Sequence, residues 1–369
     1  MLNRVLQKNI EDRLDQQKVS LLIGARRVGK TELLKAIMGK KSGTTLWLNG
    51  EDADVQALLE NRTVANYKRL LSGYNLLIID EAQYIPDIGR KAKLMIDEIK
   101  PLHIILTGSS AFDIVQNGEP LTYHLYPIAQ MELQPIENPL QTQQHLEERL
   151  IYGSYPELLG LPTLTDKQAY LRELINTYLL KDILAFEDIR QAQKLRDLLV
   201  LLAYQIGGEV SQEELGRQLG ISKNTVARYL DLLSKVYVIF SRGGFSRNLR
   251  KEVVKSQRWY FVDNGIRNAL INQFSPLALR QDVGQLWENY FISERQKRNA
   301  YHEEHINSYF WRTYDQQEID LIEEKSGQLT ALECKWREQK VKAPVAFANA
   351  YPDAKFMIAH QGNYEELIL

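Results

Sequence analysis

The chain has 369 residues, of which 44% are hydrophobic and 25% charged, and its formal net charge is −1. This length predicts two or three domains, and the composition is typical of a globular protein. Because the total charge is close to zero, it does not indicate a nucleic-acid or membrane partner, which only a local cluster of cations could do.

Two further features of the sequence indicate the cellular compartment. The single cysteine, Cys334, excludes an internal disulfide and suits a reducing environment. Apolar runs such as LLIID and VYVIF are far shorter than the ~20 apolar residues that span a bilayer. We therefore expect a cytoplasmic protein with no membrane partner.

The segment KVSLLIGARRVGKTELLKAI combines an apolar run at 19–23, the pattern G-x-x-x-x-G-K-[ST] at 24–31 and helical apolar spacing after it. In such a strand-loop-helix unit the glycines let backbone N–H groups converge on phosphate oxygens. Lys30 would reach the β- and γ-phosphates of ATP, and Thr31 would offer its hydroxyl to Mg²⁺. The predicted nucleotide-binding residues are Gly24, Ala25, Arg26, Arg27, Val28, Gly29, Lys30, Thr31 and Glu32.

Two later apolar segments end in polar side chains. NLLIIDEAQ, at 75–83, predicts a buried strand that ends at Asp80 and Glu81, and LHIILTGSS, at 102–110, predicts another. Asp80 would complete the Mg²⁺ shell, and Glu81 would polarise the attacking water. The second segment ends in three hydroxyl groups able to sense the γ-phosphate: Thr107, Ser109 and Ser110. The predicted catalytic residues are Lys30, Glu81 and Thr107.

Further strands are predicted at 44–50 and 122–127, and helices at 53–62 and 88–99. This alternation is typical of a parallel sheet covered by helices on both faces. An additional strand is expected between the phosphate-loop strand and the acidic strand. All the polar motifs fall at carboxyl ends of strands, where open α/β sheets bind ligands.

The segments LLIGARRVGKTELL, LLIIDEAQYIPD and IILTGSSAFDI resemble the AAA+ superfamily ATPases of bacteria and archaea that carry an uncharacterised C-terminal domain. Later segments agree: IYGSYPELL, LLKDIL and WYFVDNGIRNAL. The resemblance implies ATP binding and hydrolysis, a winged helix, a nuclease-like tail and, by analogy, a homo-oligomeric ring. In one departure, Thr122, Tyr123 and His124 stand where the family has a Gly-Arg pair before LYPI. Candidates for an arginine that acts on a neighbouring subunit are Arg90, Arg149, Arg172 and Arg190.

Residues 210–240 predict two short helices joined by a glycine turn, which is a helix-turn-helix. Ser211 would cap the first helix, Gly220 would end it, and Ser222 would cap a second helix that begins at Lys223. Near its start the second helix carries residue types that contact DNA phosphates and base edges: Lys223, Asn224, Thr225 and Arg228.

The hairpin expected after this helix, the wing, concentrates positive charge between residues 242 and 258, with Glu252 as its one anion. Its cations are Arg242, Arg247, Arg250, Lys251, Lys255 and Arg258. Because phosphate contacts supply much of the affinity for DNA, this patch favours a DNA-binding winged helix, with Arg242, Arg247, Arg250 and Lys251 among the contacts. Winged helices also dock proteins, and that alternative stays open.

Past residue 276 the pattern predicts a helix, three alternating strands with a turn at Ser326 and Gly327, a short helix at 345–350 and a last strand. This order resembles the restriction-endonuclease-like PD-(D/E)XK fold. Glu333 and Lys335 are two apart and so share a strand face, with Asp320 on the paired strand. The expected roles are Mg²⁺ ligation by Asp320 and Glu333, a further ligand from Glu288, and orientation of water by Lys335. The alternative is a solvated surface pair without chemistry.

We therefore expect an α/β protein with a parallel-sheet P-loop NTPase core of the AAA+ type at 1–139 and a helical lid at 140–205. A winged helix at 206–275 and an α+β restriction-endonuclease-like domain at 276–369 would follow. The leading hypothesis is Mg²⁺-dependent ATP hydrolysis by an ATPase that binds and remodels or translocates on DNA. The alternatives are a nucleotide-controlled assembly switch that docks proteins, and an ATP-regulated Mg²⁺-dependent nuclease.

Overall fold

The computed structural model describes residues 2–40, 43–109, 120–179, 191–246 and 257–369. The chain forms two compact units, Met1–Tyr126 and Pro127–Leu369. Within the described ranges, no helix is long and apolar enough to cross a membrane.

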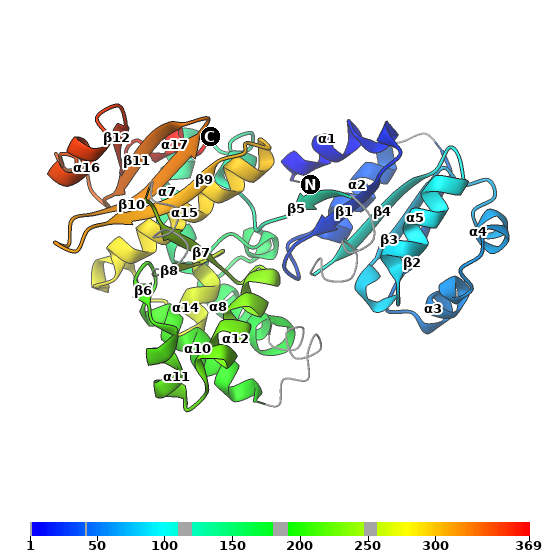
Figure 1. The fold of residues 1–369 in the computed structure, drawn as a ribbon, viewed down its shortest axis with the longest axis horizontal. Helices are drawn as coiled ribbons and strands as arrows, with labels where there is room; N and C mark the ends of the chain where they lie inside the picture. Colours follow the sequence, from blue (N-terminus) through cyan, green and yellow to red (C-terminus); the bar gives the residue numbers. More distant parts are fainter. Residues whose placement is uncertain (1, 41–42, 110–119, 180–190, 247–256) are drawn as a thin grey trace. The chain divides into compact units, whose positions relative to one another are not determined.

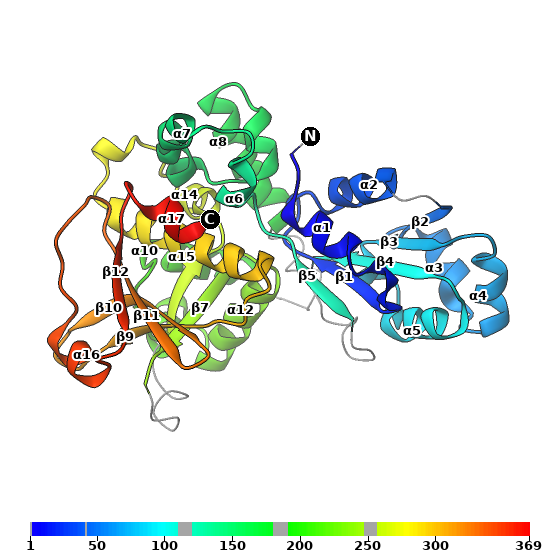
Figure 2. The same cartoon turned by 90° about the horizontal axis from the view of Figure 1, so that it is seen from above.

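The first unit is built on a five-stranded sheet with the order β2-β3-β4-β1-β5, in which every pair of neighbours is parallel (Figure 1). The strands are β1 (Val19–Ile23), β2 (Thr45–Asn49), β3 (Leu76–Asp80), β4 (His103–Gly108) and β5 (Leu121–His124). The helices are α1 (Val5–Glu11), α2 (Lys30–Lys40), α3 (Ala53–Glu60), α4 (Val64–Leu70) and α5 (Ile88–Glu98). Figure 2 shows α2 and α5 on opposite faces of the sheet.

The central strands of this unit are buried along almost their whole length. Leu21 to Ile23 in β1, Leu77 to Ile79 in β3 and Ile104 to Leu106 in β4 have almost no exposed surface. Continuous apolar runs are what a parallel strand needs when helices cover both of its faces. The predicted α/β core is therefore confirmed, and β4 is the additional strand expected between the phosphate-loop strand and the acidic strand.

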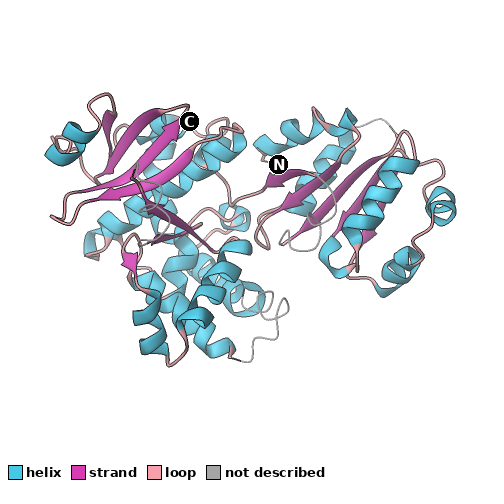
Figure 3. Ribbon diagram, in the orientation of Figure 1, coloured by secondary structure: helices cyan, strands magenta, loops and turns pink. Residues whose placement is uncertain are grey.

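The first elements of the second unit are helices, which Figure 3 distinguishes from strands by colour. They are α6 (Gln130–Leu133), α7 (Pro139–Tyr152), α8 (Leu164–Glu173), a π-helix at Leu174–Leu179, α10 (Ala192–Tyr204), α11 (Gln212–Leu219), α12 (Lys223–Lys235) and α14 (Asn264–Leu270). The predicted caps of α11 and α12 are confirmed, because Ser211 Oγ accepts from Glu214 N at 3.3 Å and Ser222 Oγ accepts from Thr225 N at 3.1 Å. Gly220 ends α11 with φ of 66°, a conformation that favours glycine.

A mixed seven-stranded sheet follows, with the order β12-β11-β10-β9-β7-β8-β6. Its strands are β6 (Glu209–Val210), β7 (Ile239–Gly244), β8 (Gln257–Phe261), β9 (Asn307–Arg312), β10 (Glu318–Lys325), β11 (Gln328–Cys334) and β12 (Lys355–Ala359). The helices of this region are α15 (Val283–Tyr301), α16 (Val345–Ala350) and α17 (Tyr364–Ile368). Because β7 pairs in parallel with β9, the sheet runs without a break across residue 276.

The predicted alternation of buried and exposed residues is wrong for β10. Five consecutive residues of this strand, 319–323, are buried. The strand packs against α15, where Arg295 Nε donates to Glu323 Oε1 at 3.1 Å, and against a core cluster that includes Phe347 of α16. The turn at Ser326 and Gly327 is confirmed as a two-residue connection between β10 and β11.

Candidate functional site

The loop between β1 and α2 is shaped by two glycines for different reasons. Gly29 has φ of 96°, which a side chain would strain, and α2 begins at the next residue. Gly24 is needed for a close approach, since a Cβ there would overlap the carbonyl oxygen of Leu125. The need for glycine at position 24 depends on Leu125, which is 101 positions away, so the motif alone could not reveal it.

Two buried cations hold this loop. Arg4, which sequence reasoning missed, donates from Nη1 to Val28 O at 2.7 Å and from Nη2 to Tyr126 O at 2.6 Å. Lys30 Nζ donates to the carbonyl oxygens of Gly24 and Ala25, at 2.9 and 3.1 Å. The Lys30 ammonium therefore lies inside the curve of its own loop.

The carboxyl ends of β3 and β4 bring the predicted catalytic groups together beside α2. Thr31 Oγ1 donates to Asp80 Oδ2 at 3.0 Å, and Thr107 Oγ1 donates to Asp80 Oδ1. The backbone N–H of Glu81 donates to Thr107 Oγ1 at 3.0 Å. Three side chains and the backbone N–H of Glu81, from three separate segments of the sequence, thus form one connected polar network.

Glu81 is held in an unusual backbone conformation. Its φ is 49°, in the left-handed region that costs free energy for any residue other than glycine. Gln83 Nε2 donates to Glu81 Oε2 at 2.6 Å and orients the carboxylate. Sequence reasoning assigned no role to Gln83, although its position two residues after the acid was visible.

Among the remaining predicted loop residues, Ala25 and Val28 are buried, Arg26 is half-buried, and Arg27 and Glu32 are exposed. Arg26 contacts Glu51 at 3.5 Å and donates to Tyr84 Oη at 3.3 Å, which ties the loop to the segments after β2 and β3. Glu32 is exposed and pairs with Lys35 on the same helix. Ser110 lies outside the described residues.

The residues at this edge fit ATP with Mg²⁺. A threonine hydroxyl and a carboxylate are oxygen ligands of the type that Mg²⁺ takes. Within the described part of the chain, Ser109 Oγ and Gln83 Oε1 are buried and have no hydrogen-bond partner. Buried polar atoms are normally satisfied, so these two leave hydrogen-bonding capacity at the edge where a nucleotide or water would lie.

The second predicted site, Glu288, Asp320, Glu333 and Lys335, lies in the other unit. Its three acids adjoin Glu318, which is exposed, and the four acids are here named the carboxylate cluster: Glu288, Glu318, Asp320 and Glu333. Asp320 Oδ2 accepts from the backbone N–H of Cys334 at 2.8 Å, so β10 presents it to β11 as expected. Lys335 Nζ lies 2.7 Å from Glu333 Oε1. The side chains expected to share a strand face are therefore in contact.

An arginine stands among these acids. Arg258 on β8 donates from Nη2 to Glu318 Oε2 at 2.6 Å, and its Nη1 lies 3.7 Å from Asp320 Oδ1 and 4.0 Å from Glu288 Oε1. Its guanidinium also lies over the ring of Phe310. Sequence reasoning counted Arg258 in an exposed basic patch. That prediction is wrong, because Arg258 is 5% exposed and belongs to the same sheet as the acids.

Burial and mutual repulsion disfavour the charged forms of Glu288 and Asp320. Burial, and then the charge of Asp320, raise the pKa of Glu288 well above its usual range, although Arg258 opposes this. Burial and the charge of Glu333 raise the pKa of Asp320 to about 7. Tyr260 Oη donates to Glu288 Oε1 at 2.8 Å. To be ionised at neutral pH, Glu288 and Asp320 therefore need nearby positive charge, which acids in water would not.

The arrangement does not fit the predicted Mg²⁺ site. Among the residues that the structure describes, no three His, Cys, Asp or Glu side chains are grouped so that they could hold a metal ion. Glu333 Oε2 is buried without a hydrogen-bond partner, which is a feature that a cation would satisfy. However, Asp320 and Glu288 already face the guanidinium of Arg258, so the cation at the centre of the cluster is a side chain.

The predicted DNA contacts divide into four groups. Lys223, Asn224 and Arg228 are exposed on α12, with Lys223 Nζ 3.0 Å from Glu213 Oε1. Thr225 is half-buried and bonded to the capping Ser222. Arg242 turns inward, over Phe240, and donates to Gln296. The other predicted wing cations lie outside the described residues: Arg247, Arg250, Lys251 and Lys255.

The candidates for a subunit-crossing arginine also differ in their surroundings. Arg149 is buried and donates to both carboxylate oxygens of Glu137, so it is a structural residue of α7. Arg172 donates to Asn272 Oδ1 at 2.8 Å. Arg90 is exposed, and Arg190 lies outside the described residues.

Three family models match the chain: an AAA domain at residues 16–134, and two domains of unknown function, DUF8612 at 143–277 and DUF4143 at 283–365. An uncharacterized protein of Mycobacterium tuberculosis is 26% identical over 87% of this chain and 71% of its own length. An uncharacterized protein of Methanocaldococcus jannaschii is 23% identical over 86% of this chain and 75% of its own length.

Among solved structures, a Walker-type ATPase of Pyrococcus abyssi matches with a TM-score of 0.51 and 13% identity, over 73% of this chain and 96% of that one. At this identity the likeness shows the fold alone. The AAA match, the parallel sheet and the phosphate-loop geometry agree with one another. The first unit of this chain therefore matches the AAA domain model and has the fold of the P-loop ATPases.

Proposed function

We propose that the chain hydrolyses ATP in a Mg²⁺-dependent reaction at the carboxyl ends of β1, β3 and β4. The observation that carries this proposal is the network that joins Thr31, Asp80, Thr107 and Glu81 beside the phosphate loop. Phosphoryl transfer needs little covalent chemistry from the protein, and positioned charges supply most of the catalysis.

Each group has a role in this scheme. Loop N–H groups and Lys30 bind the phosphates, with phosphate oxygens replacing the carbonyls of Gly24 and Ala25 around the ammonium. Mg²⁺, held by Thr31 and Asp80, would neutralise charge on the β- and γ-phosphates. Glu81 orients the attacking water, while Gln83 holds the carboxylate in place.

Turnover measurements on the full chain test the site. Lys30→Ala should lose nucleotide binding and turnover, whereas Glu81→Gln should keep binding and lose turnover by at least about 100-fold, the lower range for a positioned acid or base. Glu98→Gln is the matched control, because Glu98 is exposed at the last residue of α5 and belongs to no predicted nucleotide-binding or catalytic group. Undiminished hydrolysis in Lys30→Ala or Glu81→Gln would refute the assignment.

We further propose that this ATPase acts on DNA through α12. The helix follows α11 across a glycine turn, and it presents Lys223, Asn224 and Arg228 to solvent in its first two turns. An exposed second helix of this kind is the element that enters the major groove in helix-turn-helix proteins. The exposed cations support phosphate contacts, whose strength falls as salt rises.

A salt titration of binding to duplex, single-stranded and branched DNA tests this second step. The Lys223→Ala, Arg228→Ala double variant should bind more weakly and with a shallower dependence on salt. Lys235→Ala is the control, because Lys235 lies at the other end of α12 and pairs with Asp231. Hydrolysis measured with each DNA form identifies the one that stimulates it.

Protein docking is the competing function. It requires nucleotide-dependent assembly in the absence of DNA, measured by sedimentation, and no salt-dependent affinity for any DNA form. The homo-oligomeric ring expected by analogy would be detected in the same sedimentation experiment. The predicted Mg²⁺-dependent nuclease is not proposed, because Arg258 holds the centre of the carboxylate cluster.

A further inference from the structure

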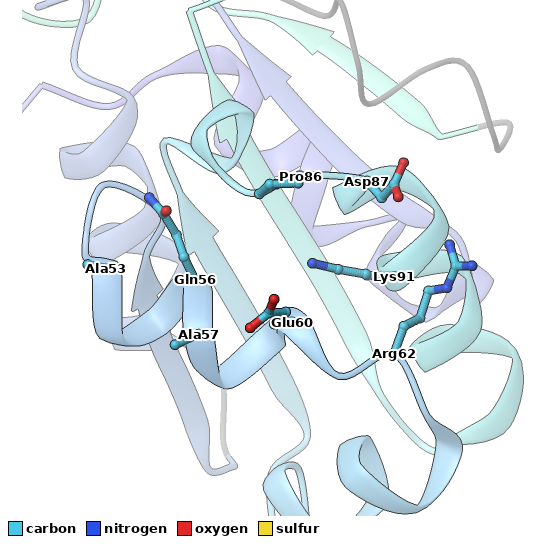
Figure 4. A pocket seen from close by; sticks show the side chains of 8 residues that line it. All are labelled: Ala53, Gln56, Ala57, Glu60, Arg62, Pro86, Asp87 and Lys91. Carbon is cyan, nitrogen blue, oxygen red and sulfur yellow. The ribbon is translucent and has the colours of Figure 1, made fainter.

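A pocket of about 600 Å³ lies in the first unit, between α3 and the start of α5 (Figure 4). It is separate from the phosphate loop, which contributes no residue to its lining. Four of its lining side chains are charged: Glu60, Arg62, Asp87 and Lys91. Its volume is in the range of ordinary small-molecule sites.

Lys91 is the unusual member of this lining. The residue is 5% exposed, and Figure 4 shows its side chain extending from α5 into the hollow that Glu60 enters from α3. Among the described residues, none makes a hydrogen bond or an ion pair with the Lys91 ammonium. Burial lowers the pKa of Lys91, although the charges of Asp87 and Glu60 oppose this. The stem of Lys91 is therefore buried, and its ammonium lines the pocket without a close counter-ion in the described ranges, so an anion in the pocket would stabilise its charge.

The start of α5 adds to the same preference. The helix has 11 residues, and its N-cap, Asp87, has no side-chain hydrogen bond to the first turn. Helix N-termini carry partial positive charge and favour anions. Arg62, which is exposed, supplies a second cation at the edge of the pocket.

We propose that this pocket binds a small organic anion, with a carboxylate or phosphate group placed against the Lys91 ammonium and the start of α5. Glu60 and Asp87, which also line the pocket, carry carboxylates that accept hydrogen bonds. They therefore favour a ligand that carries a hydrogen-bond donor as well as its anionic group. The site is assigned to a metabolite-sized molecule and not to a macromolecule.

The wall of the pocket is joined to the catalytic acids. Gln56 Nε2 donates to Gly50 O at 2.8 Å, and Gly50 N donates to Asp80 O at 2.7 Å. Gly50 also lies against the backbone of Glu81. A Cβ at position 50 would overlap the carbonyl oxygen of Glu81. A ligand that shifts α3 therefore shifts the backbone of both acids, and it regulates hydrolysis. This regulatory step rests on the ATPase activity proposed above, whereas the binding step does not.

Competitive labelling of lysines with acetic anhydride, read by mass spectrometry on the full chain, tests binding. Only the neutral amine reacts, and an anion beside Lys91 favours the charged form. A rise of one unit in the pKa of Lys91 slows its labelling about tenfold. The probes are succinate, citrate and inorganic phosphate, each against sodium chloride at the same ionic strength. Lys93, exposed on the same helix, is the control and should react equally in all of them.

A slowing confined to succinate and citrate identifies a carboxylate ligand, and one confined to phosphate identifies a phosphate ester. If no probe slows Lys91 more than Lys93, the site is refuted. Calorimetry with the best probe should show loss of binding in Lys91→Met and retention in Lys93→Met. Because Lys91→Met alters the core, Arg62→Gln provides an exposed second variant, which should weaken binding about three- to tenfold; unchanged affinity in both variants overturns the proposal.

Hydrolysis measured with the same probe separates the two steps. A changed turnover number that Arg62→Gln abolishes supports regulation, and an unchanged turnover number refutes regulation while binding stands. Absence of any ATPase activity in a chain whose Lys91 is still protected refutes the proposed function and not the pocket.

Discussion

Replacing Arg258 by methionine tests whether a side chain, and not a metal ion, holds the carboxylate cluster together. The substitution keeps most of the apolar volume and leaves Glu288 and Asp320 buried without their cation. Removing one partner of a buried ion pair costs about 3–5 kcal/mol, and loss of the contact with Phe310 adds up to about 1–2 kcal/mol. Protonation of the acids reduces the total, so we expect a destabilisation of about 3–5 kcal/mol.

Urea unfolding of the full chain without nucleotide, followed by tryptophan fluorescence, measures this change. Four of the five tryptophans, Trp259, Trp287, Trp311 and Trp336, lie in the second unit and report on it. The measurement is repeated with Mn²⁺ and with a chelator. The wild-type transition of this unit should not respond to either, because Arg258 already supplies the charge. The variant should gain stability with Mn²⁺, by about 2.7 kcal/mol at a concentration 100 times the Kd.

Arg295→Met is the matched control. Arg295 also pairs with a buried acid of β10, Glu323, but it contacts no member of the carboxylate cluster. The Arg295→Met substitution should destabilise the protein by a similar amount, but its unfolding transition should not respond to Mn²⁺. The reasoning fails if the wild-type unit is stabilised by Mn²⁺ and Asp320→Ala removes that stabilisation. It also fails if Arg258→Met leaves the unfolding transition unchanged.

Three further predictions concern positions outside the cluster. Gln83→Ala should lower kcat about tenfold, with a smaller change in KM, since Gln83 orients the carboxylate of Glu81. Although burial alone would raise it, hydrogen bonds from two arginines lower the pKa of Asp282 to about 2, so its stabilisation is present above pH ~4 and is lost as the pH falls toward 2. Asp282→Asn should therefore cost about 1 kcal/mol at pH 7 after allowance for solvent screening, and the two unfolding curves should converge near pH 2. Gly220→Ala should lower the Tm through backbone strain of about 1 kcal/mol, whereas Gly220→Asn, which tolerates this conformation, should recover most of it.

The nucleotide site could be predicted because its determinants are local. A short apolar run, a glycine-rich loop and a helix follow one another within residues 19–40, and each later acid or hydroxyl comes directly after its own apolar strand. Parallel strands place their carboxyl ends at one edge, so the separate motifs converge without further information. The supporting residues could not be predicted in this way. Arg4 reaches Val28 and Tyr126 through contacts that no pattern in its neighbourhood indicates.

Counting charges along the sequence predicted exposed cations less well than apolar spacing predicted helices and strands. Arg149, Arg242 and Arg258 all read as available cations, yet each turns toward a partner inside its unit. An arginine carries three apolar methylene groups and a weakly hydrated head, which makes it the cation best suited to buried ion pairs. Helix and strand periodicity places the backbone of such a residue, but the partner lies on a different element and decides whether the charge faces water.

The carboxylate cluster shows why a motif does not determine the ion at its centre. The turn at Ser326 and Gly327 and the pairing of Asp320 with the strand of Glu333 were predictable, because both follow from a two-residue connection. Arg258 lies on β8, which pairs with β7, and the parallel pairing of β7 with β9 brings both strands into the sheet of the acids. That parallel pairing joins residues about 65 apart and leaves no local trace in either strand. The charge balance of the cluster therefore depends on a side chain from β8, which is separated from β10 by β9 and β7 in the sheet. A substitution at position 258, outside the predicted motif, is the change that tests whether an ion pair holds the cluster together.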